Sequence, residues 1–336
     1  PYGTEASGLR LATTAEFSIA GAMVLSNGAG VNRFPIRAGT DGADGLAPLT
    51  QAEVRALLEE AFTIMSRARA QIRRPLDSRA EVSLSVVDTR GQILGIVRSP
   101  DAPVFGIDVS AQKARTAMFF SAPFAAADLN ADPSADVRSF VQKTRDFFAS
   151  PTALTGQTAF GARTIGNLSR PYYPDGEVGR PNGPLSRPIN QWSPLSTGLQ
   201  SALIVGNLVQ HLTFVTGGSA TDTPQVCTFQ PDVAPGQKRL ANGIQIFPGG
   251  VPIYRGGRLV GGIGVSGDGI DQDDMISFLG AHNGGLKVGG SVGNAATAIR
   301  ADQLVVGPTA PARLRYVGCP FAPFLDTNDQ NACQGK

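Results

Sequence analysis

Only two histidines, His211 and His282, are available for metal or acid–base chemistry among the 336 residues. This number excludes a His-rich metal site, and a Ser-His-Asp triad would have to use one of the two. Either could still ligate the iron of a haem, which needs only one proximal side chain. The structural alternatives are a core histidine for His211, in an apolar segment, and for His282 an imidazolium near the negative end of the last predicted helix.

Two basic residues, Lys113 and Arg115, follow Asp108 on a predicted helix. They could anchor a ligand carboxylate such as a propionate, and a surface ion pair is the alternative. The net charge is only +2, from 29 basic and 27 acidic residues, and no run of like charges forms a binding tail. Binding to nucleic acid or to an anionic membrane is therefore not expected.

A glycine pattern, G-x-G-x-x-G over residues 262–267, has the spacing of a dinucleotide-binding loop. Such a loop holds phosphates at a helix N-terminus, where free N–H groups attract negative charge. The helix that follows here opens with four aspartates: Asp268, Asp271, Asp273 and Asp274. Their charges would repel a pyrophosphate, and their order does not match a calcium loop. We expect the aspartates to cap the helix and the glycines to allow a strand and a helix to cross closely.

Three cysteines, Cys227, Cys319 and Cys333, match no zinc or haem-attachment spacing. Cys319 and Cys333 flank an irregular tail, and a disulfide between them would close a loop of about 15 residues, worth roughly 3 kcal/mol. Cys227 would then be buried or bonded elsewhere. The alternative is three reduced thiols in a cytoplasmic protein.

Composition favours an exported protein. Charged residues make up 17% of the chain, below the usual ~25%. The chain begins at Pro1, as a mature protein would after loss of a signal peptide. No stretch approaches the ~18 apolar residues of a membrane-spanning helix. We expect a periplasmic or secreted protein that does not span the membrane.

Hydrophobic spacing predicts an α+β fold. A helix begins at Thr50, which forms a capping box with Glu53. The following patterns predict, in order, a hairpin over 82–97, a helix over 107–122, a helix over 134–150, an apolar segment over 196–215, three short strands over 244–267, and a helix over 271–281. This order indicates an antiparallel sheet with helices packed on it.

Three sequence blocks together resemble the GlcG/HbpS-like haem-binding family. The first is the helix block LTQAEVRALLEEAF, residues 49–62. The second joins V-V-D-x-x-G (86–91) to D-x-P (101–103) and A-x-K-A-x-T-A (111–117). The third is FPGGVPIYRGGRLVGGIGVSG, residues 247–267. Their order along the chain is that of the family.

The chain departs from the compact members of this family by a long, partly helical insertion and by extensions at both ends. The resemblance implies a profilin-like fold, in which helices flank a five-stranded antiparallel sheet. It also implies homo-oligomers and binding of haem or a related tetrapyrrole. Haem degradation is attached to the family name, but a defined catalytic constellation is not part of the pattern. The predicted parts are an N-terminal extension (1–44), the family domain (45–124 and 240–285), an insertion (125–239) and a C-terminal tail (286–336).

Two functions follow from the sequence. The first is an exported haem or tetrapyrrole binder without turnover, with Lys113 and Arg115 as propionate partners and His211 or His282 as iron ligand. The alternative is a non-catalytic structural or assembly subunit of an extracytoplasmic complex, which has lost its ligand. An enzyme has the least support, because no nucleophile–base pair or metal cluster emerges.

Overall fold

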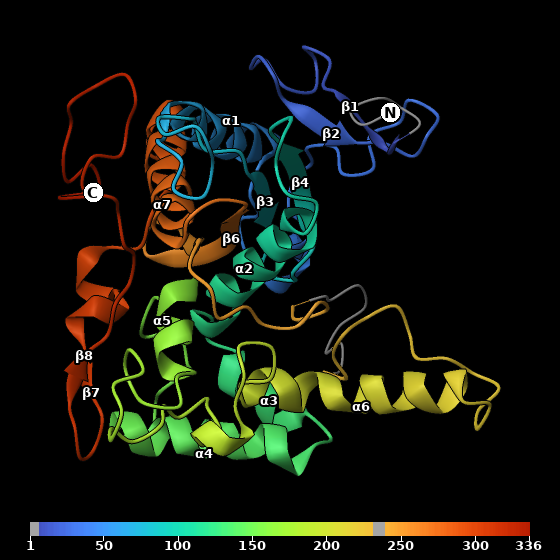
Figure 1. Cartoon of the computed structure of the whole chain (residues 1–336), viewed down its shortest axis with the longest axis vertical. Coiled ribbons are helices and arrows are strands. Elements are labelled where there is room, and N and C mark those ends of the chain that lie inside the picture. The colour runs from blue at the N-terminus through green and yellow to red at the C-terminus, as the bar shows by residue number, and fades with distance from the viewer. Residues whose placement is uncertain (1–6, 231–238) are drawn as a thin grey trace.

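An antiparallel sheet of six strands, in the order β1-β2-β4-β3-β6-β5, forms the centre of the computed structural model (Figure 1), which describes residues 7–230 and 239–336. The strands are β1 (Leu9–Leu11), β2 (Met23–Leu25), β3 (Ser83–Val87), β4 (Ile93–Arg98), β5 (Gly250–Arg255) and β6 (Arg258–Ser266). A separate small pair joins β7 (Val305–Val306) to β8 (Ala312–Arg313).

Helices cover both faces of the sheet. Helices α1 (Gln51–Arg67) and α7 (Ile270–Lys287) lie side by side on one face, and α2 (Gly106–Phe120) crosses β3 and β6 on the other. The remaining helices gather below this body in Figure 1: α3 (Ala125–Ala131), α4 (Ala135–Phe148), α5 (Ala162–Leu168) and α6 (Leu199–Val215). The predicted α+β class is confirmed.

The predicted capping box is present at the start of α1. Thr50 Oγ1 accepts a hydrogen bond from the Glu53 backbone N–H, and the Glu53 carboxylate accepts one from the Thr50 backbone N–H. These bonds satisfy two of the N–H groups that a helix start leaves without a helical partner.

The glycines of β6 allow the close crossing expected from the sequence. A Cβ at Gly262 or Gly264 would overlap the α2 carbonyl oxygens of Ala114 and Ser110. At Gly267 the backbone φ is +147°, which favours glycine, and a Cβ would meet the Glu81 carbonyl. The pattern therefore serves packing between strand and helix.

Two expectations about the sheet are wrong. Residues 244–247 form no strand, so two strands, β5 and β6, replace the predicted three. The sheet has six strands instead of five because the N-terminal extension adds β1 and β2 beyond β4. Residues 37–45 are held against the β3–β4 turn, since Asp41 is buried and accepts hydrogen bonds from the Thr89 N–H and hydroxyl.

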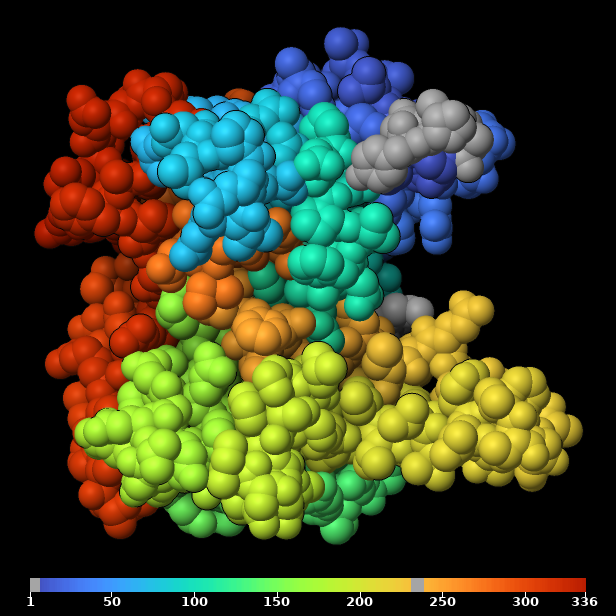
Figure 2. All heavy atoms as spheres, viewed as in Figure 1, coloured from blue at the N-terminus to red at the C-terminus, as the bar shows by residue number. Residues whose placement is uncertain are grey.

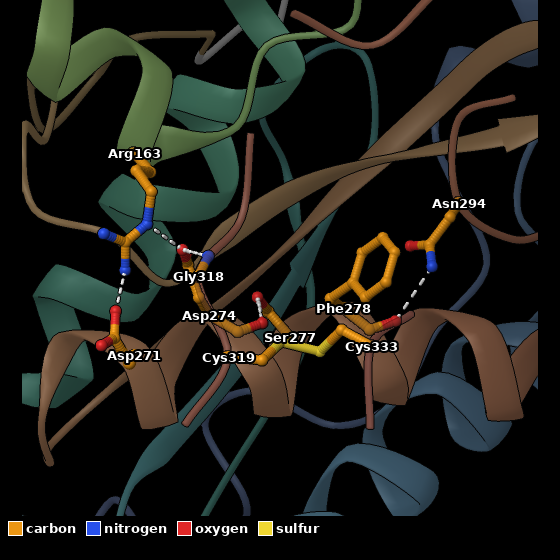
Figure 3. Close-up of a disulfide and its surroundings, with 9 residues drawn as sticks. All are labelled: Arg163, Asp271, Asp274, Ser277, Phe278, Asn294, Gly318, Cys319 and Cys333. Carbon is orange, nitrogen blue, oxygen red and sulfur yellow. Dashed lines mark hydrogen bonds and ion pairs between the residues drawn. A yellow bond between two sulfur atoms is a disulfide. The ribbon is translucent and has the colours of Figure 1, made fainter. Parts of the chain in front are cut away.

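The C-terminal tail is fastened beside α7. The predicted disulfide joins Cys319 to Cys333 (Figure 3). Cys227 is free and exposed, contrary to the expectation that it is buried or bonded elsewhere. Among the helices of residues 7–230 and 239–336, none is long and apolar enough to cross a membrane.

Candidate functional site

Helix α2 turns Lys113 and Arg115 toward different neighbours. The buried Lys113 Nζ donates to Asp273 Oδ2 at 2.9 Å and to the Val265 carbonyl at 2.8 Å. Burial raises the pKa of Asp273 to about 6, although the Lys113 charge acts in the opposite direction. Lys113 thus links α2 to the start of α7 through a buried ion pair, and the surface ion pair considered above is not formed.

The aspartates at the start of α7 bind other parts of the chain (Figure 3). Both carboxylate oxygens of Asp274 accept backbone N–H bonds, from Gly249 at 2.6 Å and from Gly318 at 2.8 Å. Arg163 on α5 donates to both Asp274 and Asp271. The N-cap residue Gly269 has no side chain to cap α7, but its N–H donates to Asp268 Oδ1 at 2.8 Å, and the Asp268 N–H donates to Asp273 Oδ1 at 3.3 Å. The aspartates therefore bind N–H groups at the helix start, and Asp273 and Asp274 also form ion pairs, because buried charges need partners.

Arg115 lines a pocket of about 340 Å³. We call it the arginine pocket; its lining residues are Arg33, Phe34, Pro35, Arg37, Gln92, Ile93 and Arg115. Arg115 Nε donates to the Gly91 carbonyl at 2.8 Å, and Nη1 donates to Asn242 Oδ1 at 2.6 Å. Burial lowers the pKa of Arg115 to about 10. Lys113 does not line this pocket, so the structure does not bring the two predicted anchors together.

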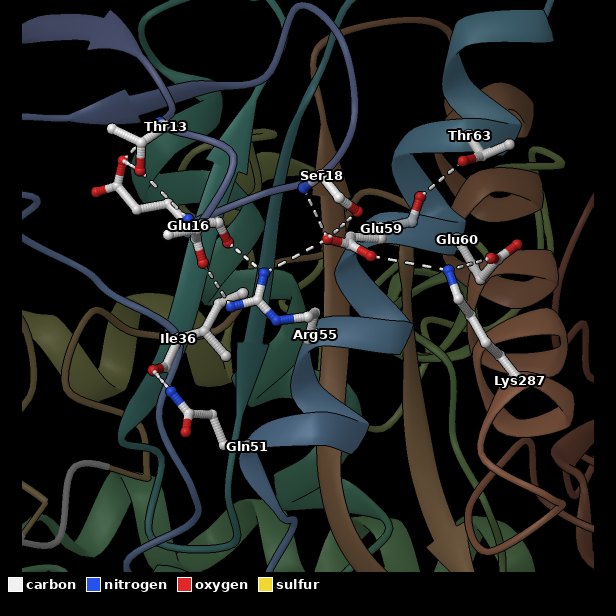
Figure 4. Close-up of polar contacts among 11 residues, drawn as sticks. Thr13, Glu16, Ser18, Ile36, Gln51, Arg55, Glu59, Glu60, Thr63 and Lys287 are labelled. Atoms are coloured by element: carbon white, nitrogen blue, oxygen red, sulfur yellow. Dashed lines mark hydrogen bonds and ion pairs between the residues drawn. The ribbon is translucent and has the colours of Figure 1, made fainter.

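The N-terminal extension supplies the other two arginines, and α1 holds the extension in place (Figure 4). Ser18 donates through its N–H and its hydroxyl to Glu59 Oε1, each at 3.0 Å. Gln51 Nε2 donates to the Ile36 carbonyl at 2.9 Å, and Arg55 Nη1 donates to the Glu16 carbonyl at 2.6 Å. These bonds fix the segment on both sides of Arg33.

His211 lies far along α6, in a helix that leaves the body of the molecule (Figures 1 and 2). Its imidazole is exposed, contrary to the expectation of a core histidine, and Nδ1 lies 2.8 Å from Asp222 Oδ1. A carboxylate at one ring nitrogen orients a histidine and leaves the other nitrogen available for a metal. Although Thr213 is polar, most exposed side chains on this part of α6 are apolar: Val205, Leu208, Val209, Leu212, Phe214 and Val215.

His282 lies within α7, not after it. Burial lowers the pKa of its imidazole, and the charges of Lys336 and Arg300 act in the same direction. Neither histidine lines the arginine pocket. No group of three His, Cys, Asp or Glu residues suited to a metal ion occurs in the described part of the chain.

The comparison with protein families decides where this chain belongs. The model of the family described as "Haem degrading protein HbpS-like" matches residues 57–165 and 206–281, more than half of the chain. The chain belongs to the HbpS-like family. The matched ranges include α1 from residue 57, the β3–β4 hairpin, α2, β5 and β6, which carry the resemblance seen in the sequence, and α7 as far as residue 281. No curated protein matches the chain.

Solved structures give distant likenesses. The crystal structure of HbpS has a TM-score of 0.29 and 16% identity, covering 69% of this chain and 85% of its own. The Klebsiella pneumoniae protein ORFY has a TM-score of 0.29 and 16% identity, over 74% and 93%. The structure of a PduOC:heme complex has a TM-score of 0.28 and 16% identity, over 73% and 94%.

Arg33 and Arg37 were not predicted as site residues, because they precede the family domain in a segment with no evident helix or strand. One signal was available. Phe34 and Ile36 alternate with more polar neighbours just before the predicted first helix, as in the edge of a sheet. The contact of this segment with β4 depends on long-range pairing, which local spacing does not specify.

Proposed function

We propose that this protein is an exported binder of haem or a related tetrapyrrole that does not turn its ligand over. Family membership is the observation that supports the ligand class most strongly. When bound, haem supplies a redox-active iron held by axial protein ligands. The chain's own residues would orient the ligand and ligate its iron. Arg115 stays our candidate for binding a propionate. Lys113 does not, because its Nζ already donates to Asp273 and to the Val265 carbonyl.

Of the two histidines, we favour His211 as the iron ligand. Its ring is exposed, Asp222 holds Nδ1, and apolar side chains surround it on α6. His282 is half-buried and lies near two positive charges, which disfavour binding of a cation. His282→Ala therefore serves as the matched control for His211→Ala.

The test is a haemin titration of the purified full chain, followed by absorption. We expect a saturable Soret band that His211→Ala shifts or weakens and His282→Ala leaves unchanged. Asp222→Asn should weaken binding about ten-fold or more, because partners of a ligating histidine typically contribute 10- to 100-fold in metal affinity.

A second test addresses turnover. Haem extracted after incubation with a reductant in air should be intact; appearance of cleaved tetrapyrrole would contradict the absence of turnover. If added haemin stays spectrally free, haem binding is excluded.

A second function is favoured by α6 itself. A structural or assembly subunit would use its exposed apolar surface for contacts between subunits. Helix α6 contains no Asp, Glu, Lys or Arg, so two copies could pair without repulsion between like charges. We propose a second copy of this chain as the partner, which agrees with the homo-oligomer expected from the family resemblance.

A further inference from the structure

Three arginines without ion-pair partners line one pocket. Arg33, Arg37 and Arg115 form no ion pair with any residue in 7–230 or 239–336, although most other arginines of the chain do. No aspartate or glutamate lines the pocket. Three like charges gathered around one space repel each other and favour an anion between them.

Arg115 is the strongest part of this observation. It is only 6% exposed, and a buried cation is costly without a counter-charge. Among the described residues it donates to two neutral acceptors, Gly91 O and Asn242 Oδ1, and Nη2 has no partner. The guanidinium is thus fixed in direction by the protein with no carboxylate in direct contact, although the more distant Asp108 and Asp88 attract its charge. This is the arrangement expected of a preformed anion site.

The other two arginines are placed by pairing of the extension with β4. The Arg37 N–H donates to the Leu94 carbonyl at 2.9 Å, and the Ile96 N–H donates to the Phe34 carbonyl at 3.4 Å. Arg37 Nε also donates to the Ile93 carbonyl at 2.9 Å, and the Arg33 guanidinium lies 5.7 Å from the Phe34 ring centroid. The pocket is therefore built by the extension and the family domain together.

We infer that the arginine pocket binds an organic anion carrying two or more carboxylates. Guanidinium groups match carboxylates in a two-point geometry. Phe34, Pro35 and Ile93 give the pocket apolar walls, which suit the carbon skeleton of such a ligand. The volume of about 340 Å³ is small for a ligand site, so it suits a free dicarboxylic acid or the carboxylate edge of a larger molecule.

Two sources have this chemistry: the propionate edge of haem and a small free dicarboxylate. For haem the inference deepens the proposed function and rests on it.

The experiment uses the full chain. Haemin and haemin dimethyl ester are the probes followed by absorption, and succinate is the probe followed by calorimetry. The variant is Arg33→Ala/Arg37→Ala, because both side chains are exposed at the pocket and their loss should leave folding intact. The control is Arg258→Ala/Arg313→Ala, which removes the same charge from exposed positions outside the pocket.

We expect the pocket variant to weaken haemin binding at least about ten-fold, with the control unchanged, since charge-assisted hydrogen bonds are the stronger kind. The dimethyl ester should bind more weakly than haemin and equally to the variant and the wild type. If haemin and its ester bind equally, or both double variants lose the same affinity, the inference is overturned while haem binding stands.

If haemin does not bind at all, the proposed function fails and succinate decides. Saturable heat with wild type that disappears in Arg33→Ala/Arg37→Ala would support the pocket as a site for a free dicarboxylate. Absence of heat with wild type would overturn the inference as well.

Discussion

The ion pair between Lys113 and Asp273 has a consequence for stability at the scale of single residues. Both side chains are about 3% exposed, so removing one partner leaves a buried charge alone. We expect Lys113→Met to lower the free energy of unfolding by about 3–5 kcal/mol at pH 8. Denaturant unfolding, followed by circular dichroism, measures this loss.

The stability lost in Lys113→Met should depend on pH. The pKa of Asp273 is raised to about 6, above its unfolded value of about 3.9. A raised pKa means that the folded state binds the proton more tightly than the unfolded state does. The stability that this protonation contributes is present at low pH and is lost as pH rises through the folded pKa. Removing Lys113 raises this pKa further, and the loss should therefore be smaller at pH 5 than at pH 8.

Lys287→Met is the matched control. Lys287 also pairs with carboxylates, Glu60 at 3.0 Å among them, but its side chain is 50% exposed. Its loss should lower stability by less than about 1 kcal/mol at both pH values. A Lys113→Met protein that loses the same stability at pH 5 and pH 8 would contradict the assignment to Asp273.

At the scale of elements, α6 separates into an anchored half and an exposed half. Leu199, Ala202 and Leu203 are buried, whereas Leu208 and Leu212 are 62% and 59% exposed. Figure 2 shows the exposed half standing out from the rest of the surface. Because Leu208 and Leu212 are four residues apart, they lie on one face of the helix.

If α6 pairs with α6 of a second copy, Leu208→Glu/Leu212→Glu should weaken self-association by at least about ten-fold, because each buried leucine contributes about 1.5–3 kcal/mol. Light scattering after size-exclusion chromatography measures the mass at several concentrations. Leu76→Glu, which changes a leucine 75% exposed in a loop, is the control. A wild-type protein that is monomeric at all concentrations would rule out this interface.

Elements that depend on local signals were predictable from the sequence. The capping box set the start of α1, turn residues set the β3–β4 hairpin, and helical spacing predicted α2 and α4. What was missed depends on distant contacts. One example is the sheet edge, where β1 and β2 add to a distant part of the chain. Another is the set of buried ion pairs, in which Asp273 binds Lys113 and Asp274 binds Arg163. For the site, residue types indicated Arg115 and His211, but the pocket partners Arg33 and Arg37 follow only from the pairing of the extension with β4.

At the scale of the whole molecule, the tail from Gly318 onward connects parts that are far apart in the sequence. The Gly318 N–H binds Asp274 on α7, and the Leu325 N–H donates to the Arg67 carbonyl at the end of α1, at 2.9 Å. The disulfide between Cys319 and Cys333 joins residues 14 positions apart within this tail. The tail therefore couples the two helices that cover one face of the sheet.

Replacing both cysteines, Cys319→Ser/Cys333→Ser, should lower the free energy of unfolding by about 2–4 kcal/mol, because the unfolded chain gains the freedom of an open loop. Cys227→Ser, at the free and exposed cysteine, is the control and should change stability by less than about 0.5 kcal/mol.

The same residues test export. A disulfide persists in the periplasm or outside the cell, so protein taken from its native compartment and denatured without reductant should titrate one thiol. Three thiols would contradict both the disulfide in the native protein and the proposed export.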